Sequence, residues 1–139
     1  MKLSRREALW LAFGGAASAT LANPAFAATV EELTAAFTAG ATPAMDGITL
    51  TAPEIAENGN TVPISVDAPG AVAVMLLAAG NPEPAVATCT FGAAAGKQMF
   101  ATRIRLAKTQ DVIALAKMAD GSIKQASATV KVTIGGCGG

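Results

Sequence analysis

Histidine and tyrosine are absent from the 139-residue chain, and its one tryptophan, Trp10, lies close to the N-terminus. Without histidine, the chain cannot by itself form a Ser–His or Cys–His catalytic pair. Zinc, iron or haem sites with histidine ligands are excluded for the same reason. The two cysteines, Cys89 and Cys137, form no C-x-x-C motif and are too few for a thiolate metal cage. We therefore expect a protein that is not an enzyme and that holds no metal or cofactor of its own.

A convincing membrane span is also lacking, because the N-terminal apolar stretch, 8–21, is short and interrupted by glycine, serine and threonine. It follows the pair Arg5-Arg6 and precedes Ala25-Phe26-Ala27, which fits a small-x-small cleavage site. We expect residues 1–27 to be a twin-arginine signal peptide that directs export to the periplasm and is then removed. An unprocessed N-terminal anchor is the alternative.

Basic residues show no excess, since lysine and arginine together number ten and so do aspartate and glutamate. No basic patch with interleaved aromatic residues is present, which argues against a nucleic-acid surface. The residues after the leader have the length of one ordinary domain. We expect a single domain at 28–134, followed by a tail at 135–139.

Residues 30–39 have the periodicity of a short amphipathic helix. Val30, Leu33 and Phe37 recur at spacings of three and four, and Thr29 is a suitable N-cap. We expect this apolar stripe to pack on the domain itself, with packing on a partner as the alternative.

From Ile48 onwards the apolar period changes to two, and turn signals separate six to eight short segments. The triplet 58–60, Asn-Gly-Asn, predicts a hairpin turn because both residue types tolerate positive φ angles. The continuous apolar run 71–78 predicts a strand that is buried on both faces. This pattern is typical of an all-β fold, an immunoglobulin-like antiparallel β-sandwich with a short N-terminal helix and a flexible glycine-rich C-terminal arm.

The last five residues, Gly135-Gly136-Cys137-Gly138-Gly139, place one thiol among four glycines. A structural cysteine belongs in a packed core, because the free thiol behaves as a small hydrophobe. Here the neighbouring glycines offer nothing to pack against, and three extended residues beyond Ile134 would carry the sulfur about 10 Å from the folded body. No basic side chain in the tail activates the thiol. We expect a carrier arm that presents Cys137 to the active sites of other proteins, which supply that activation.

Other roles for the tail cysteine stay open. It could be incidental in a loose chain end, could form a disulfide with Cys89, or could link two subunits covalently. Cys89 alternates with Ala87 and Phe91, which favours a packing residue that faces the core.

The chain resembles the SoxY family, the carrier subunits of the bacterial sulfur-oxidising multienzyme system. The resemblance is carried by the twin-arginine leader, by residues 48–59 (ITLTAPEIAENG) and 102–112 (TRIRLAKTQDV), and by the ending 132–139 (VTIGGCGG). It implies that sulfur intermediates are attached covalently at Cys137. The carrier arm would then include the four flanking glycines, Gly135, Gly136, Gly138 and Gly139.

The same resemblance implies partners for the chain. SoxZ, a second small β-sandwich protein, would form a heterodimer with it. The cytochrome complex SoxAX would couple thiosulfate to the thiol, the hydrolase SoxB would release sulfate, and a sulfane dehydrogenase would oxidise the remaining sulfur. Haem, manganese and molybdenum would belong to these visiting enzymes. Cys89 departs from the family pattern, which needs only the terminal cysteine.

Two further functions remain as alternatives. A sulfur carrier could instead use a thiocarboxylate on Gly139, but that chemistry needs ATP, which the compartment beyond the membrane does not supply. An exported structural or adhesion sandwich would have no use for residues 135–139.

Overall fold

Eight strands and one helix make up residues 27–136, the part of the chain that the computed structural model describes. The expected leader, apart from Ala27, and the tail residues Cys137, Gly138 and Gly139 lie outside the described residues. The elements in chain order are α2 (Val30–Thr38), β1 (Thr49–Thr51), β2 (Ile55–Asn58), β3 (Val62–Asp67), β4 (Ala71–Ala78), β5 (Ala85–Thr90), β6 (Met99–Ile104), β7 (Gln110–Met118) and β8 (Ile123–Ile134).

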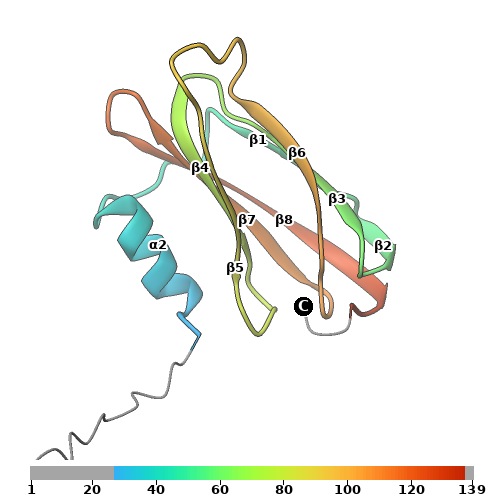
Figure 1. Ribbon diagram of the computed structural model, residues 1–139. Coiled ribbons are helices and arrows are strands. Elements are labelled where there is room, and N and C mark those ends of the chain that lie inside the picture. The colour runs from blue at the N-terminus through green and yellow to red at the C-terminus, as the bar shows by residue number, and fades with distance from the viewer. Residues whose placement is uncertain (1–26, 137–139) are drawn as a thin grey trace, which may run out of the picture.

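The strands form two facing sheets (Figure 1). One sheet has three strands in the order β1-β3-β6, and the other has five in the order β2-β8-β7-β4-β5. This arrangement confirms the predicted two-sheet sandwich. The strand pairing is antiparallel, as predicted, except that β2 runs parallel to β8.

The predicted hairpin at 58–60 is wrong. The Oδ1 of Asn58 accepts the N–H of Asn60 at 3.0 Å, so the chain does turn here. However, β3 lies between β1 and β6, which leaves no place beside it for β2. Strand β2 instead pairs with β8, and the turn carries the chain from one sheet to the other. Gly59 is not among the glycines with positive φ.

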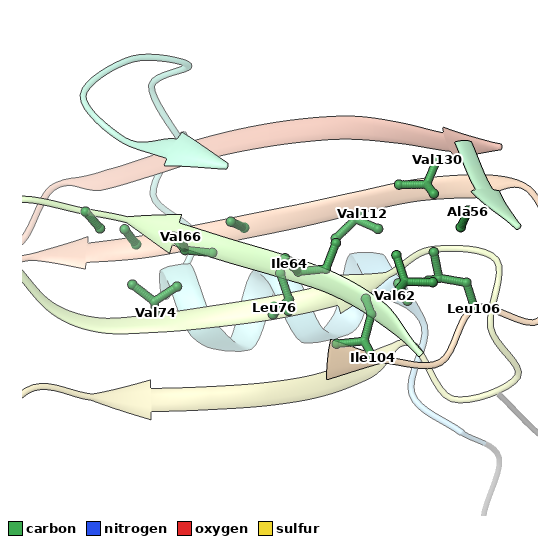
Figure 2. Packing of buried hydrophobic residues seen from close by; sticks show 14 of the residues in the cluster. Ala56, Val62, Ile64, Val66, Val74, Leu76, Ile104, Leu106, Val112 and Val130 are labelled. Atoms are coloured by element: carbon green, nitrogen blue, oxygen red, sulfur yellow. The ribbon is translucent and has the colours of Figure 1, made fainter. Parts of the chain in front are cut away.

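The space between the sheets is filled by alternate residues of the central strands, as the two-residue period of a strand requires (Figure 2). Strand β4 matches the predicted apolar run, but burial on both faces is confirmed only for its second half. There, Leu76 lies in the core between the sheets and Leu77 in a second cluster on the other face. Val72, near the start of the strand, is exposed. The larger fully or almost fully buried members of the main core are Val62, Ile64, Val66, Val74, Leu76, Ile104, Leu106, Val112 and Val130.

Helix α2 covers part of the outer face of the five-stranded sheet. It begins with a capping box, in which Thr29 Oγ1 accepts the Glu32 N–H at 3.2 Å and the Glu32 carboxylate accepts the Thr29 N–H at 2.8 Å. The helix contacts the cluster formed by Leu77, Leu115 and Ile123. The prediction that the helix packs within the domain is therefore confirmed. The residues that it contributes are Val30, Leu33 and Phe37.

Within residues 27–136, helix α2 lacks the length and the apolar character that are needed to cross a membrane.

Candidate functional site

Two connections between the sheets meet the end of β8. The β2–β3 connection contains Gly59, and the β6–β7 connection contains Leu106 and Ala107. The side chain of Leu106 is fully buried in the main core. Figure 1 shows that β8 runs from the β7–β8 turn at one end of the sandwich to the C-terminal tail at the other. The start of the tail therefore lies against two segments that are distant in sequence.

Three backbone hydrogen bonds, which we call the arm clasp, join these segments. The Gly59 N–H donates to the Ile134 carbonyl oxygen at 2.8 Å, and the Leu106 N–H donates to the Gly59 carbonyl oxygen at 2.7 Å. The Gly136 N–H then donates to the Leu106 carbonyl oxygen at 2.9 Å. Each bond has a donor–acceptor distance typical of a well-formed N–H···O bond. The arm clasp thus ties both ends of the segment 134–136 to the body of the domain.

The arm clasp leaves no room for a side chain at three of its positions, which are all occupied by glycine. A Cβ atom on Gly59 would overlap the Leu106 carbonyl oxygen and would lie 2.8 Å from the Gly136 nitrogen. A Cβ on Gly135 would overlap the Ala107 carbonyl oxygen, and one on Gly136 would lie 2.9 Å from the Gly59 carbonyl oxygen. These obstacles are backbone atoms, which cannot move aside as a flexible side chain can. Glycine is required at all three positions by close packing of the chain against itself.

The tail therefore leaves the body later than the sequence suggests. Gly136 is buried, and Gly135 is exposed but lies against Ala107. The expectation that the chain extends freely directly after Ile134 is wrong for these two glycines. Cys137, Gly138 and Gly139 lie outside the described residues, so their role as the carrier arm stays a prediction.

A buried amide network holds the segment that receives the tail. Asn81 donates from Nδ2 to the Arg105 carbonyl oxygen at 2.7 Å and accepts the Ala107 N–H at 3.0 Å. Gln110 donates from Nε2 to Asn81 Oδ1 at 2.8 Å and to the Lys108 carbonyl oxygen at 3.0 Å. Asn81 and Gln110 are both buried, and unpaired amides would be costly there. Together they fix the backbone on either side of Leu106.

Sequence reasoning did not assign a role to Gly59, Asn81 or Gln110 at this site. Asn81 follows Gly80 and precedes a proline, and that context indicates only a turn. The need for glycine at 59 depends on atoms about 50 and 80 residues further along the chain. No local pattern could have found these contacts.

Cys89 lies on β5, an edge strand of the larger sheet, and its side chain is half-buried instead of fully buried. The strand register places Cys89 opposite Val74, and Val74 opposite Ala116. Ala116 in turn lies opposite Lys124, near the start of β8. The ten residue steps from Lys124 to Ile134 span roughly 33 Å of strand. A disulfide needs Cα atoms within about 7 Å, so this register argues strongly against a bond from Cys89 to a tail anchored beyond Ile134.

Within residues 27–136, no group of three or more cysteine, aspartate or glutamate side chains is placed to hold a metal ion. A shallow groove of about 510 Å³ lies on the three-stranded sheet, lined mainly by small side chains, and Arg103 is its one charged residue. Its lining includes none of the residues of the arm clasp.

The fold and the candidate site define a class of mostly-β, two-sheet proteins with one short N-terminal helix, in which the last strand leads into a glycine-flanked cysteine. The family model described as sulfur oxidation protein SoxY matches residues 33–137, which include the arm clasp and Cys137. The chain belongs to the SoxY family. SoxY proteins carry sulfur and do not catalyse its conversion.

Solved structures agree with this assignment. The chain is 33% identical, with a TM-score of 0.65, to a structure described as the sulfur carrier protein SoxY from Chlorobium limicola f thiosulfatophilum. That match covers 76% of this chain and 97% of the Chlorobium chain. Among curated proteins, no sequence matches the chain.

A second group of solved structures shares the fold alone. A superoxide reductase (neelaredoxin) from Ignicoccus hospitalis is 16% identical, with a TM-score of 0.55. The match covers 73% of this chain and 86% of the reductase. At this identity the likeness carries no argument about function.

Proposed function

We propose that the chain is a sulfur carrier of thiosulfate oxidation, which holds sulfur intermediates covalently on Cys137 and presents them to partner enzymes. The observation that carries this proposal is the match to the SoxY family, which extends through residue 137. The arm clasp supports it, because it fixes the residue before Cys137 at one end of the sandwich. Gly135, Gly136, Gly138 and Gly139 make up the rest of the proposed arm.

The loading step joins the Cys137 thiolate to the outer sulfur of thiosulfate. A sulfur–sulfur bond forms and two electrons leave, and the haem of a SoxAX-type cytochrome complex would accept them. Hydrolysis of the product by a SoxB-type enzyme adds water, breaks the bond to the sulfone and releases sulfate and protons. A persulfide then remains on Cys137 for a sulfane dehydrogenase. The metals that this chemistry needs belong to the partners.

The proposal also includes the setting in which the chain works. A twin-arginine leader at 1–27 would bring it to the periplasm, where it would pair with a SoxZ-type subunit. The absence of histidine supports a role as a substrate-bearing carrier, since no histidine of its own chain can activate the thiol and the receiving enzyme would supply that activation.

The test is a pair of matched cysteine substitutions in a reconstituted thiosulfate-oxidising system. Cys137→Ser removes the attachment atom, so we expect turnover to fall to the background measured without the carrier. Cys89→Ser is the control, because its side chain lies on a distant edge strand, and we expect it to keep nearly full turnover. Sustained turnover by Cys137→Ser would refute the proposal.

Mass spectrometry of the loaded protein separates the two possible attachment points. We expect the tail peptide to gain the mass of a thiosulfate group on Cys137, and prior alkylation of the thiol should abolish this gain. Extra mass on Gly139 that survives alkylation would instead support a thiocarboxylate carrier.

A further inference from the structure

The arm clasp fixes the tail at Gly136, one residue before the thiol. The bond from the Gly136 N–H to the Leu106 carbonyl oxygen, 2.9 Å long, is the last backbone hydrogen bond in the described part of the chain. Consecutive Cα atoms are about 3.8 Å apart. The residue that follows Gly136 in the sequence therefore starts from an anchored point.

Without the arm clasp, the tail would be anchored no later than Ile134. Gly135 and Gly136 would then add about 7 Å to its reach. They would also add two residues whose backbone freedom is lost whenever the tail is held in another protein's active site. The arm clasp therefore shortens the distance that the tail can reach, and it reduces the conformational entropy that the tail loses when it docks.

We propose that Gly59 is a positioning residue for the carrier arm: through its contacts with Leu106 and Gly136, it sets the point at which the thiol-bearing segment leaves the body. The small size of Gly59 lets three backbones meet, and its N–H and carbonyl group supply two of the three hydrogen bonds. The consequence for sulfur transfer rests on the proposed function. The anchoring itself can be tested without any sulfur chemistry.

A nitroxide spin label on Cys137, in a Cys89→Ser background, reports on the anchoring. In Gly59→Ala the added Cβ overlaps the Leu106 carbonyl oxygen and displaces the tail. A tail released from its anchor moves more freely, so we expect this variant to narrow the electron paramagnetic resonance line of the label. Gly92→Ala is the matched control, since a Cβ there meets nothing within 4 Å and its φ is not positive. The control should leave the line shape unchanged.

A second variant keeps the test valid if Gly59→Ala does not fold. Gly136→Ala places its Cβ 2.9 Å from the Gly59 carbonyl oxygen, so it should also narrow the line while leaving the strands intact. Identical line shapes for Gly136→Ala, Gly92→Ala and the parent would overturn the proposal.

Steady-state kinetics of sulfur loading test whether the anchoring matters for transfer. With two more residues to order on docking, Gly59→Ala should raise the KM for the carrier about tenfold or more and change kcat less. A narrower line in Gly59→Ala together with an unchanged KM for the carrier would refute the positioning role. Loading that persists in Cys137→Ser would refute the proposed function instead and would leave the line-shape result standing.

Discussion

The two turns that contain Asn58-Gly59 and Asp120-Gly121 carry nearly the same sequence signal but serve different purposes. Gly121 has a φ of +86° and closes the hairpin between β7 and β8, and the space beside its Cα is open. Gly59 lacks a positive φ, joins two different sheets and has backbone atoms on several sides. Glycine is needed at one turn for its backbone angles and at the other for its size.

The two ends of β8 also differ in the groups that hold them. Near its start, Lys124 donates to Asp46 at 2.8 Å, and Asp120 accepts the Ser122 N–H at 2.9 Å and its hydroxyl at 2.6 Å. At its other end, the arm clasp joins neutral backbone groups, supported by the amides of Asn81 and Gln110. One end therefore depends on ionised side chains, and the other depends on close packing and uncharged hydrogen bonds.

The largest effect that we expect on stability comes from Gly59→Ala. The new methyl group would force backbone segments apart, and overpacking of this kind costs about 3 kcal/mol. Chemical denaturation of the protein measures the change. Gly92→Ala is the control, because it adds the same methyl group at a position with open space around it. A loss equal to that of the control would mean that glycine is not required at position 59 for its small size.

A smaller loss is expected for Gly121→Ala. An alanine at φ +86° would occupy the left-handed region, which costs about 1–2 kcal/mol for a residue with a Cβ atom. Gly121→Asn should recover part of this loss, because asparagine tolerates that conformation. The same denaturation experiment checks both variants. Equal stability of the alanine and asparagine variants would contradict a role for the backbone angle.

The smallest effect concerns pH and should appear only at the hairpin end. Hydrogen bonds from Ser122 lower the pKa of Asp120 below its usual 3.8. A lowered pKa in the folded state stabilises the fold above pH 4 and loses this contribution as the pH falls through the folded-state value. Asp120→Asn should therefore make the free energy of unfolding fall less steeply between pH 5 and pH 2.5. An unchanged slope would show that the carboxylate adds nothing to stability.

A similar effect applies to the neighbouring ion pair. The hydrogen bond and the charge of Lys124 lower the pKa of Asp46, whose side chain is largely exposed to solvent. Screening by water keeps the contribution of such a pair small. The arm clasp has no ionised member, so its bonds should not respond to pH over the same range.

Local patterns predicted those elements whose formation depends on neighbours in sequence. Thr29 forms the expected N-cap of the helix, and the second half of the apolar run of β4 is buried on both faces as its composition indicates. The alternation of the later segments predicted the sandwich, because each strand must bury one face against another sheet. These features follow from periodicity and capping alone.

The partners of β2 could not be predicted in the same way. Its four residues carry too little pattern to choose between the adjacent β3 and the distant β8. The choice depends on β1 and β6, which flank β3 on both sides. With β2 placed beside β8, Gly59 is brought to the end of the last strand.

The amino-acid sequence by itself determined the sandwich, the helix that covers it and the glycine-flanked cysteine with which the chain ends. Only the tertiary structure decided where that ending is held, because the arm clasp joins residues from three separate parts of the chain. Hydrogen bonds between distant backbone segments produce no periodic pattern in a sequence. The sequence also does not distinguish a glycine that is required for its small size from one that is required for its backbone angles. The anchor point at Gly136 follows from close packing in three dimensions.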